Sequence, residues 1–211
     1  MEKTVFIEEI KVAGGEYHNL EGHAIRMDHT IRHFFHKPFI QSTLPKLLPE
    51  PPADGRQKCV VTYADAVIDI QFEPFTPPTI NSLTMVEVKK IDFNFKTKDR
   101  GILPRVRERG GSDEAIIVHN SFFTNATTGN LVFQDEAGNL ITPLHYIHSG
   151  TKREYYLKKK RITTHPIKAE RLEYFVKVFL INALIDLEDD VSVPVKNIKP
   201  IVRFTDAPDE A

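Results

Sequence analysis

The stretch LEGHAIRMDHTIRHFF, residues 20–35, decides the organisation of the first half of the chain. Its apolar side chains recur at steps of three and four residues, at Leu20, Ala24, Met27, Ile31, Phe34 and Phe35. That spacing puts them on one side of a helix, because an α-helix turns once in about 3.6 residues. We therefore predict a long helix with one apolar face.

Short extended segments lie on both sides of this helix in the sequence. The segment from Thr4 to Val12 has strand character, and a glycine turn leads to a second short strand near Tyr17, which predicts an edge hairpin. After a proline-rich crossing, extended segments are predicted at Lys58–Tyr63, Val67–Phe72 and Ser82–Phe95. The first half is therefore expected to form an antiparallel sheet with one helix.

The second half alternates short strands with short helices. Gly101 and Pro104 limit any helix in the basic run Asp99–Arg109 to about a turn. Strands are predicted at residues 115–118, 122–125, 130–134, 140–142 and 191–195, the last of them at a sheet edge because it contains Pro194. A short helix is predicted at 152–160, a long apolar segment at 172–185 and an acidic, frayed tail at 205–211. The chain thus predicts an α+β fold with domains at residues 1–95 and 96–211.

Composition excludes several classes of protein. With 28 Lys and Arg against 29 Asp and Glu, the formal net charge is -1, which disfavours a dedicated nucleic-acid binder. The single cysteine, Cys59, excludes an internal disulfide and a cysteine zinc cluster, and indicates a reduced compartment. The sequence lacks a signal-peptide pattern and any run of about 18 apolar residues, so we expect a cytoplasmic protein without membrane contact.

Two clusters of polar residues are candidates for ligand binding. His29, His33 and His36 share one helix face, but Asp28 points off that face and a metal site needs a further ligand, so we predict solvated or core histidines and no metal site. The run Ser149–Arg153 begins a helix, where unpaired N–H groups favour an anion. The ordinary alternative is a Ser or Thr that only caps the helix.

Lys96 is a candidate nucleophile. Alternation puts Asp92, Asn94 and Lys96 on the face opposite Ile91, Phe93 and Phe95. If that face lines a cleft, burial lowers the pKa of the lysine and makes its amine reactive toward an aldehyde. If the face meets water, Lys96 is an ordinary surface residue.

Taken in order, a set of motifs resembles the class IV, or fold type IV, pyridoxal-phosphate enzymes, which include branched-chain and D-amino acid aminotransferases and aminodeoxychorismate lyases. The motifs are Phe6–Ile10, Asn19–Met27, Phe95–Arg100, Asp113–Val118, Gly129–Leu131, Ile141–Pro143, Gly150–Arg153 and Leu180–Leu184. They span nearly the whole chain. The resemblance implies a two-domain architecture like that of D-amino acid aminotransferase, with a cofactor pocket between the two domains.

The resemblance also implies roles for single residues. Lys96 falls at the lysine that forms the Schiff base, or internal aldimine, with the aldehyde of pyridoxal 5'-phosphate and later carries a proton. Arg26 falls at the arginine that holds the cofactor phosphate, a natural use of a bidentate fork. The other implied contacts are Thr151 and Lys152 to the phosphate, Asn182 and Ala183 to the phosphate or the substrate carboxylate, and Arg100 near the phenolic oxygen.

Asn125 departs from the family pattern. The family has Glu or Asp there, and this carboxylate keeps the pyridine nitrogen protonated, whereas an amide adds no charge and leaves a weaker electron sink. The resemblance implies a homodimeric aminotransferase or lyase that acts on an amino acid or keto acid. The alternative is a degenerate, non-catalytic relative that binds a phosphorylated metabolite or a partner protein. The sequence does not identify the substrate.

Overall fold

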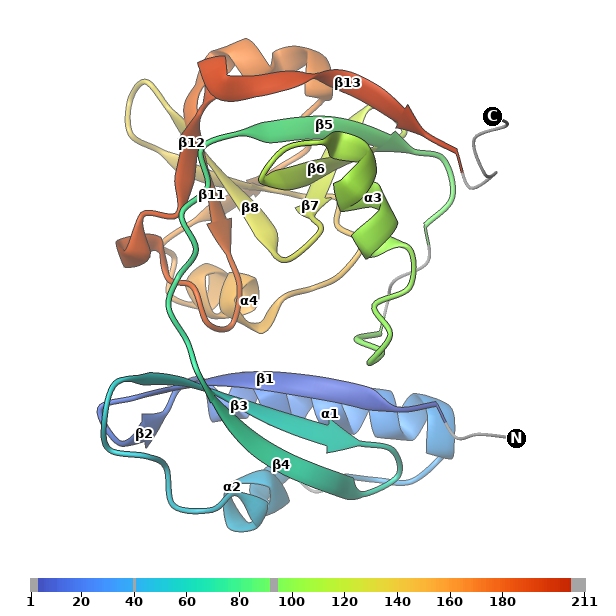
Figure 1. The fold of residues 1–211 in the computed structure, drawn as a ribbon, viewed down its shortest axis with the longest axis vertical. Coiled ribbons are helices and arrows are strands. Elements are labelled where there is room, and N and C mark those ends of the chain that lie inside the picture. The colour runs from blue at the N-terminus through green and yellow to red at the C-terminus, as the bar shows by residue number, and fades with distance from the viewer. Residues whose placement is uncertain (1–3, 40, 92–94, 206–211) are drawn as a thin grey trace. The chain divides into compact units, whose positions relative to one another are not determined.

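The computed structural model describes residues 4–39, 41–91 and 95–205. Its residues form two compact units (Figure 1). The first unit contains Met1–Pro77 and Phe95–Arg100, and the second contains Pro78–Asn94 and Gly101–Ala211. The chain passes into the second unit at about residue 78 and returns to the first unit for the six residues Phe95–Arg100. Among the described residues, no helix has the length and apolar character needed to cross a membrane.

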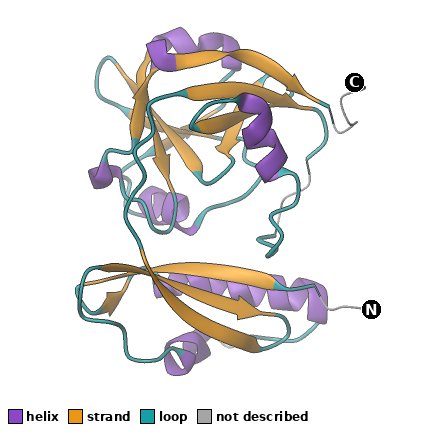
Figure 2. Cartoon of the chain, in the orientation of Figure 1, coloured by secondary structure: helices purple, strands orange, loops and turns teal. Residues whose placement is uncertain are grey.

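The first unit is a four-stranded antiparallel sheet with one long helix on a face (Figures 1 and 2). Its elements are β1 (Phe6–Ala13), β2 (Glu16–Tyr17), α1 (Leu20–Phe35), η1 (Gln41–Thr43), α2 (Leu44–Leu47), β3 (Arg56–Tyr63) and β4 (Val67–Pro74). The strand order is β2-β1-β3-β4, and β1 pairs with β3 along its whole length. This arrangement confirms the predicted edge hairpin and antiparallel sheet.

The apolar face of α1 closes the core of the first unit, as its spacing predicts. Ala24, Met27 and Ile31 of α1 are buried against a sheet face that contains Ile10 of β1 and Val61 of β3. The helix ends at His36, whose positive φ of 55° turns the chain out of the helix. At the end of α1 the apolar stripe reaches the surface, since Phe34 keeps 39% of its area exposed.

The second unit is built on a larger mixed sheet. Its elements are β5 (Leu83–Val88), α3 (Leu103–Gly110), β6 (Glu114–His119), β7 (Phe122–Ala126), β8 (Asn130–Asp135), β9 (Leu140–Pro143), α4 (Thr151–Lys158), β10 (Thr163–His165), η2 (Ala169–Tyr174), β11 (Phe175–Ile181), η3 (Leu187–Asp189), β12 (Ser192–Pro194), η4 (Val195–Asn197) and β13 (Ile198–Phe204). Seven strands follow the order β10-β9-β8-β7-β6-β5-β13, while β11 joins β8 to β12. The predicted α+β class is confirmed.

Three predictions about elements are wrong for identifiable reasons. The segment at Ser82–Phe95 does not extend the first sheet; β5 pairs in parallel with β6 and β13 in the second unit. The basic run forms a full helix, α3, because Pro104 lies in the first helical turn, where a missing N–H costs no hydrogen bond. The edge strand predicted at residues 191–195 is present as β12, which among the described strands pairs only with β11, but it is not the final strand, because β13 follows it and pairs with β5. The expected alternation at Asp92, Phe93 and Asn94 and most of the acidic tail lie outside the described residues.

Candidate functional site

Alternation along β1 sends its two consecutive glutamates to opposite faces of the first sheet. Glu8 points with Phe6 and Ile10 toward α1 and is 0% exposed. Its carboxylate accepts hydrogen bonds from Arg26 Nε at 2.7 Å, from Arg26 Nη2 at 2.5 Å and from His23 Nδ1 at 2.5 Å. Burial opposes the charge, but Arg26 and His23 outweigh it and lower the pKa of Glu8 far below its usual range.

These bonds also fix the state of the histidine. Since an ionised Glu8 can only accept, His23 Nδ1 carries the proton. Burial lowers the pKa of His23, which is therefore a neutral ring at pH 7, and its Nε2 has no hydrogen-bond partner in the described part of the chain. The guanidinium of Arg26 consequently has its side-on edge, Nε and Nη2, engaged with Glu8. A phosphate held by Arg26 would have to use the end-on edge.

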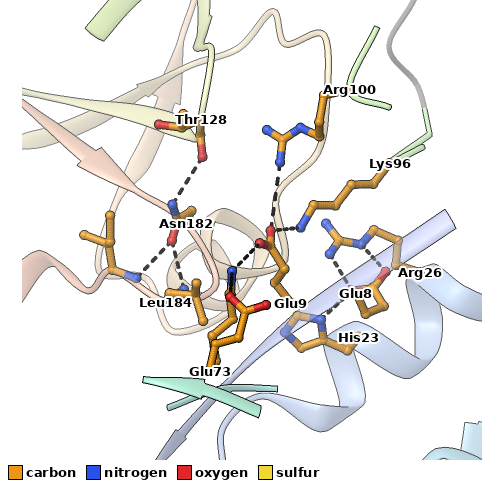
Figure 3. A network of polar contacts seen from close by, with 12 residues as sticks. Glu8, Glu9, His23, Arg26, Glu73, Lys96, Arg100, Thr128, Asn182 and Leu184 are labelled. Carbon is orange, nitrogen blue, oxygen red and sulfur yellow. Dashed lines mark hydrogen bonds and ion pairs between the residues drawn. The ribbon is translucent and has the colours of Figure 1, made fainter. Parts of the chain in front are cut away.

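Lys96 is attached to β1 through its own backbone. Its carbonyl accepts a hydrogen bond from the N–H of Ile7 at 3.1 Å, and Thr97 forms an antiparallel bridge with Phe6. The Lys96 amine then lies 2.5 Å from Glu9 Oε2, with only 12% of the side chain exposed (Figure 3). This contact joins residues 87 positions apart in the sequence.

Glu9 is the centre of a group of charges on this face. Lys58 Nζ lies 3.7 Å from Glu9 Oε1 and 2.7 Å from Glu73, and Arg100 Nη1 lies 3.9 Å from Glu9 Oε2 (Figure 3). Burial would raise the pKa of Glu9, but its hydrogen bond to Lys96 and the nearby cations lower it to about 2. For Lys96, burial lowers the pKa and Arg26 adds to this effect, while Glu9 and Glu8 oppose it.

In the second unit, the start of α4 is tightly packed. A Cβ on Gly150 would lie 1.9 Å from Asn130 Oδ1, so any larger residue here would have to displace the Asn130 side chain. Thr151 is buried, and the amine of Lys152 forms an ion pair with Asp186. The charge of Lys152 is therefore already balanced by a carboxylate of the chain.

The two predicted asparagines both hold turns. Asn125 Nδ2 donates to the carbonyl of His148 at 3.0 Å, and its Oδ1 accepts from the N–H of Ile147 at 2.9 Å. Asn182 Oδ1 accepts from the backbone N–H groups of Leu184 and Ile185, at 2.9 and 3.0 Å, both of which follow Ala183 in the same turn (Figure 3). Each amide is thus used to order the backbone beside it.

The sequence and the fold were compared with those of known proteins. A scan against known families finds no match. An uncharacterized protein of Haemophilus influenzae is 25% identical over 181 residues, which cover 84% of this chain and 96% of that protein. A structure from Haemophilus somnus 129pt, a candidate 4-amino-4-deoxychorismate lyase, matches with a TM-score of 0.77 and 24% identity over 87% of this chain and 98% of its own. The chain has the fold of class IV aminotransferases. A hypothetical aminotransferase from Mycobacterium tuberculosis in its PLP-bound form shares this fold, with a TM-score of 0.68 and 14% identity over 92% of this chain and 81% of that one.

Within the class IV aminotransferase fold, the residues proposed for the site fall into two groups. Arg26, Lys96 and Arg100 lie in the first unit, where Lys96 and Arg100 meet at Glu9 and Arg26 is bound to Glu8. The other five, Asn125, Thr151, Lys152, Asn182 and Ala183, lie in the second unit. That both groups serve one cofactor pocket stays a prediction.

The carboxylate partners were missed as functional residues. One signal for Glu8 is present in the sequence, since a glutamate between Phe6 and Ile10 on an apolar strand face requires a buried cation. No comparable signal identifies Glu9, because its partner lies 87 residues away. His29 and His33 stack on Phe95, with ring centroids at 5.4 and 4.6 Å. Among the described residues, no group of three or more His, Cys, Asp or Glu side chains is arranged to hold a metal ion.

Proposed function

We propose that the protein binds pyridoxal 5'-phosphate through Lys96 and acts as an aminotransferase or lyase on an amino acid. The observation that carries the proposal is the Lys96 amine, which is largely buried, lies against a carboxylate and has a lowered pKa. An amine in that state reacts with aldehydes at a lower pH than a surface lysine does. The shared fold with a PLP-bound aminotransferase supports the same cofactor.

The residues of the first unit fit this cofactor in part. When bound, pyridoxal 5'-phosphate supplies an aldehyde that condenses with an amine and a conjugated ring that takes up electrons from the substrate. Lys96 provides the amine and afterwards holds the proton that moves at the α carbon. Arg26 in the first unit is one candidate for holding the phosphate, and the first turn of α4 in the second unit is a separate candidate.

The fit at the ring nitrogen is poorer. Asn125 carries no charge, and its amide is already bonded to the backbone at Ile147 and His148. Its Oδ1 can accept a second hydrogen bond, but such a contact brings no negative charge to a ring nitrogen. We therefore expect an electron sink weaker than that of an enzyme with a carboxylate at this position, and a slow reaction.

Cofactor attachment tests the proposal directly. The purified full-length protein is incubated with pyridoxal 5'-phosphate, reduced with borohydride and digested, and the labelled lysine is identified by mass spectrometry. We expect the wild type and a Lys58→Ala control to carry the label at Lys96, and Lys96→Ala to carry none. The control is matched because Lys58 shares Glu9 with Lys96. Scattered labelling of surface lysines in all three proteins would refute the proposal.

A second candidate function is favoured by the pairing of the cations. Arg26, Lys96 and Lys152 each contact a carboxylate of the chain itself, namely Glu8, Glu9 and Asp186. A non-catalytic relative that retains a phosphorylated metabolite is the alternative that such pairing supports. A half-transamination assay with a panel of amino acids separates the two, because only the enzyme releases a keto acid. Sedimentation velocity tests the expected homodimer.

A further inference from the structure

The contact between Lys96 and Glu9 is built from three separate parts of the first unit. β1 supplies Glu9, β3 supplies Lys58 opposite Lys11, and the segment at residues 95–100 supplies Lys96 and Arg100. Arg100 adopts a positive φ of 60°, a conformation that side-chain-bearing residues rarely adopt. The chain thus accepts local strain at the residue whose guanidinium lies 3.9 Å from Glu9.

Glu9 has more cations around it than a single ion pair needs. Lys96 is closest at 2.5 Å, and Lys58 and Arg100 follow at 3.7 and 3.9 Å. If Lys96 loses its proton, Lys58 and Arg100 still stabilise the negative charge of Glu9. The carboxylate therefore remains ionised whether Lys96 is charged or neutral.

We propose that Glu9 is a positioning residue for Lys96, because its carboxylate fixes the place of the amine and retains its proton until an aldehyde is bound. The inference extends the proposed function, in which Lys96 is the reactive amine. The groups that face Lys96 include Glu9 and Glu8, which favour its charged form, and Arg26, which disfavours it. Glu9 is the nearest of them, so its removal has the largest effect.

The sign of the effect follows from these charges. Without Glu9, burial and Arg26 act on Lys96 with less opposition, so the amine becomes neutral at a lower pH. An opposite charge at this distance changes a pKa by about 1–3 units, and partial exposure of the pair places the expectation at about 1–2 units. At a pH where the amine is mostly charged, each unit raises its reactive fraction about tenfold.

The test measures Lys96 without any cofactor. Apo protein is pulse-labelled with a small amine reagent, acetic anhydride, over a range of pH, and the modified Lys96 peptide is quantified by mass spectrometry. In Glu9→Gln we expect the pH of half-maximal labelling to fall by about 1–2 units. Glu73→Gln is the matched control. Glu73 is also a carboxylate of this group, but it pairs with Lys58, whereas the ion pair of Lys96 is with Glu9. It should shift the profile by less than a third of that amount.

An internal reference lysine and a second Glu9 variant separate a local effect on Lys96 from unfolding. Lys177, in the second unit, is an internal reference in the same samples and should keep its profile in every variant. Glu9→Asp keeps the charge on a shorter side chain and should restore part of the shift, even if Glu9→Gln proves poorly folded. An unchanged or raised labelling pH in Glu9→Gln, or a profile in Glu9→Asp that moves as far as that of Glu9→Gln, would overturn the inference. A shifted profile in a protein that never takes up pyridoxal 5'-phosphate would uphold it and refute the proposed function.

Discussion

Replacing Glu8 with glutamine should destabilise the first unit more than any surface substitution. Glu8 is 0% exposed and accepts three charge-assisted hydrogen bonds, two from Arg26 and one from His23. Glutamine has a similar shape, but its NH₂ group would face one of these donors and its charge is gone. Removing one partner of a buried ion pair costs about 3–5 kcal/mol, because the other charge stays buried without compensation.

The loss should depend on pH in a defined direction. The folded pKa of Glu8 lies far below its ordinary value of 4.5, so its stabilising contribution is fully present above that value. The contribution decreases as the pH falls from 4.5 toward the folded pKa. The difference between wild type and Glu8→Gln should therefore be largest near neutral pH and shrink on acidification.

Hydrogen exchange measured by mass spectrometry can follow this effect in one unit. Peptides from α1 report the opening of the first unit at pH 7 and below pH 4, in increasing urea. The matched control is Asp65→Asn, which removes an exposed pair with Lys37 and should change the opening free energy by no more than about 1 kcal/mol. An effect of Glu8→Gln as small as that of the control, or one that persists unchanged in acid, would refute the reasoning.

Two further predictions concern the second unit. Asn125→Asp replaces the donor to His148 with a carboxylate, so we expect a loss of about 1–3 kcal/mol by thermal unfolding; unchanged stability would contradict this. Gly129→Ala places a Cβ 2.4 Å from the carbonyl of Ile181, so we expect a loss of at least about 3 kcal/mol by the same measurement. In the control, Gly14→Ala, the added Cβ meets no atom within 4 Å, so the only cost is the strain of alanine at a positive φ. Equal losses of stability in the two variants would show that the backbone moves to relieve the contact between Cβ and the Ile181 carbonyl.

Helix α1 could be predicted from local sequence because the apolar residues that recur at helical spacing are largely the ones that the fold buries. The apolar spacing from Leu20 to Phe35 is a property of neighbouring residues, and the helix has these same limits. The pairing of β5 is different in kind, since its partners β6 and β13 begin about 30 and 115 residues away. Nothing in the composition of Leu83–Val88 distinguishes a strand of the first sheet from one of the second.

The candidate site divides in the same way. The prediction that Lys96 is the reactive residue came from a resemblance carried by short motifs, each of which is local. The carboxylate that contacts Lys96, Glu9, is placed there by the backbone bridge between Phe6 and Thr97, and this bridge is a tertiary contact. Adjacent acidic residues on a strand indicate only that one of them is buried, as Glu8 is.

The carboxylates that pair with the cations of the first unit oppose the binding of an anionic cofactor. One group of side chains in the first unit contains four cations, Arg26, Lys58, Lys96 and Arg100, and three carboxylates, Glu8, Glu9 and Glu73. These seven side chains together carry an excess of one positive charge. Because buried cations without partners would be costly, these carboxylates let the unit fold before any ligand binds. The same carboxylates repel a phosphate that approaches Arg26. Removing a carboxylate should therefore strengthen phosphate binding while weakening the fold, so affinity and stability in this unit oppose each other through the same two glutamates of β1.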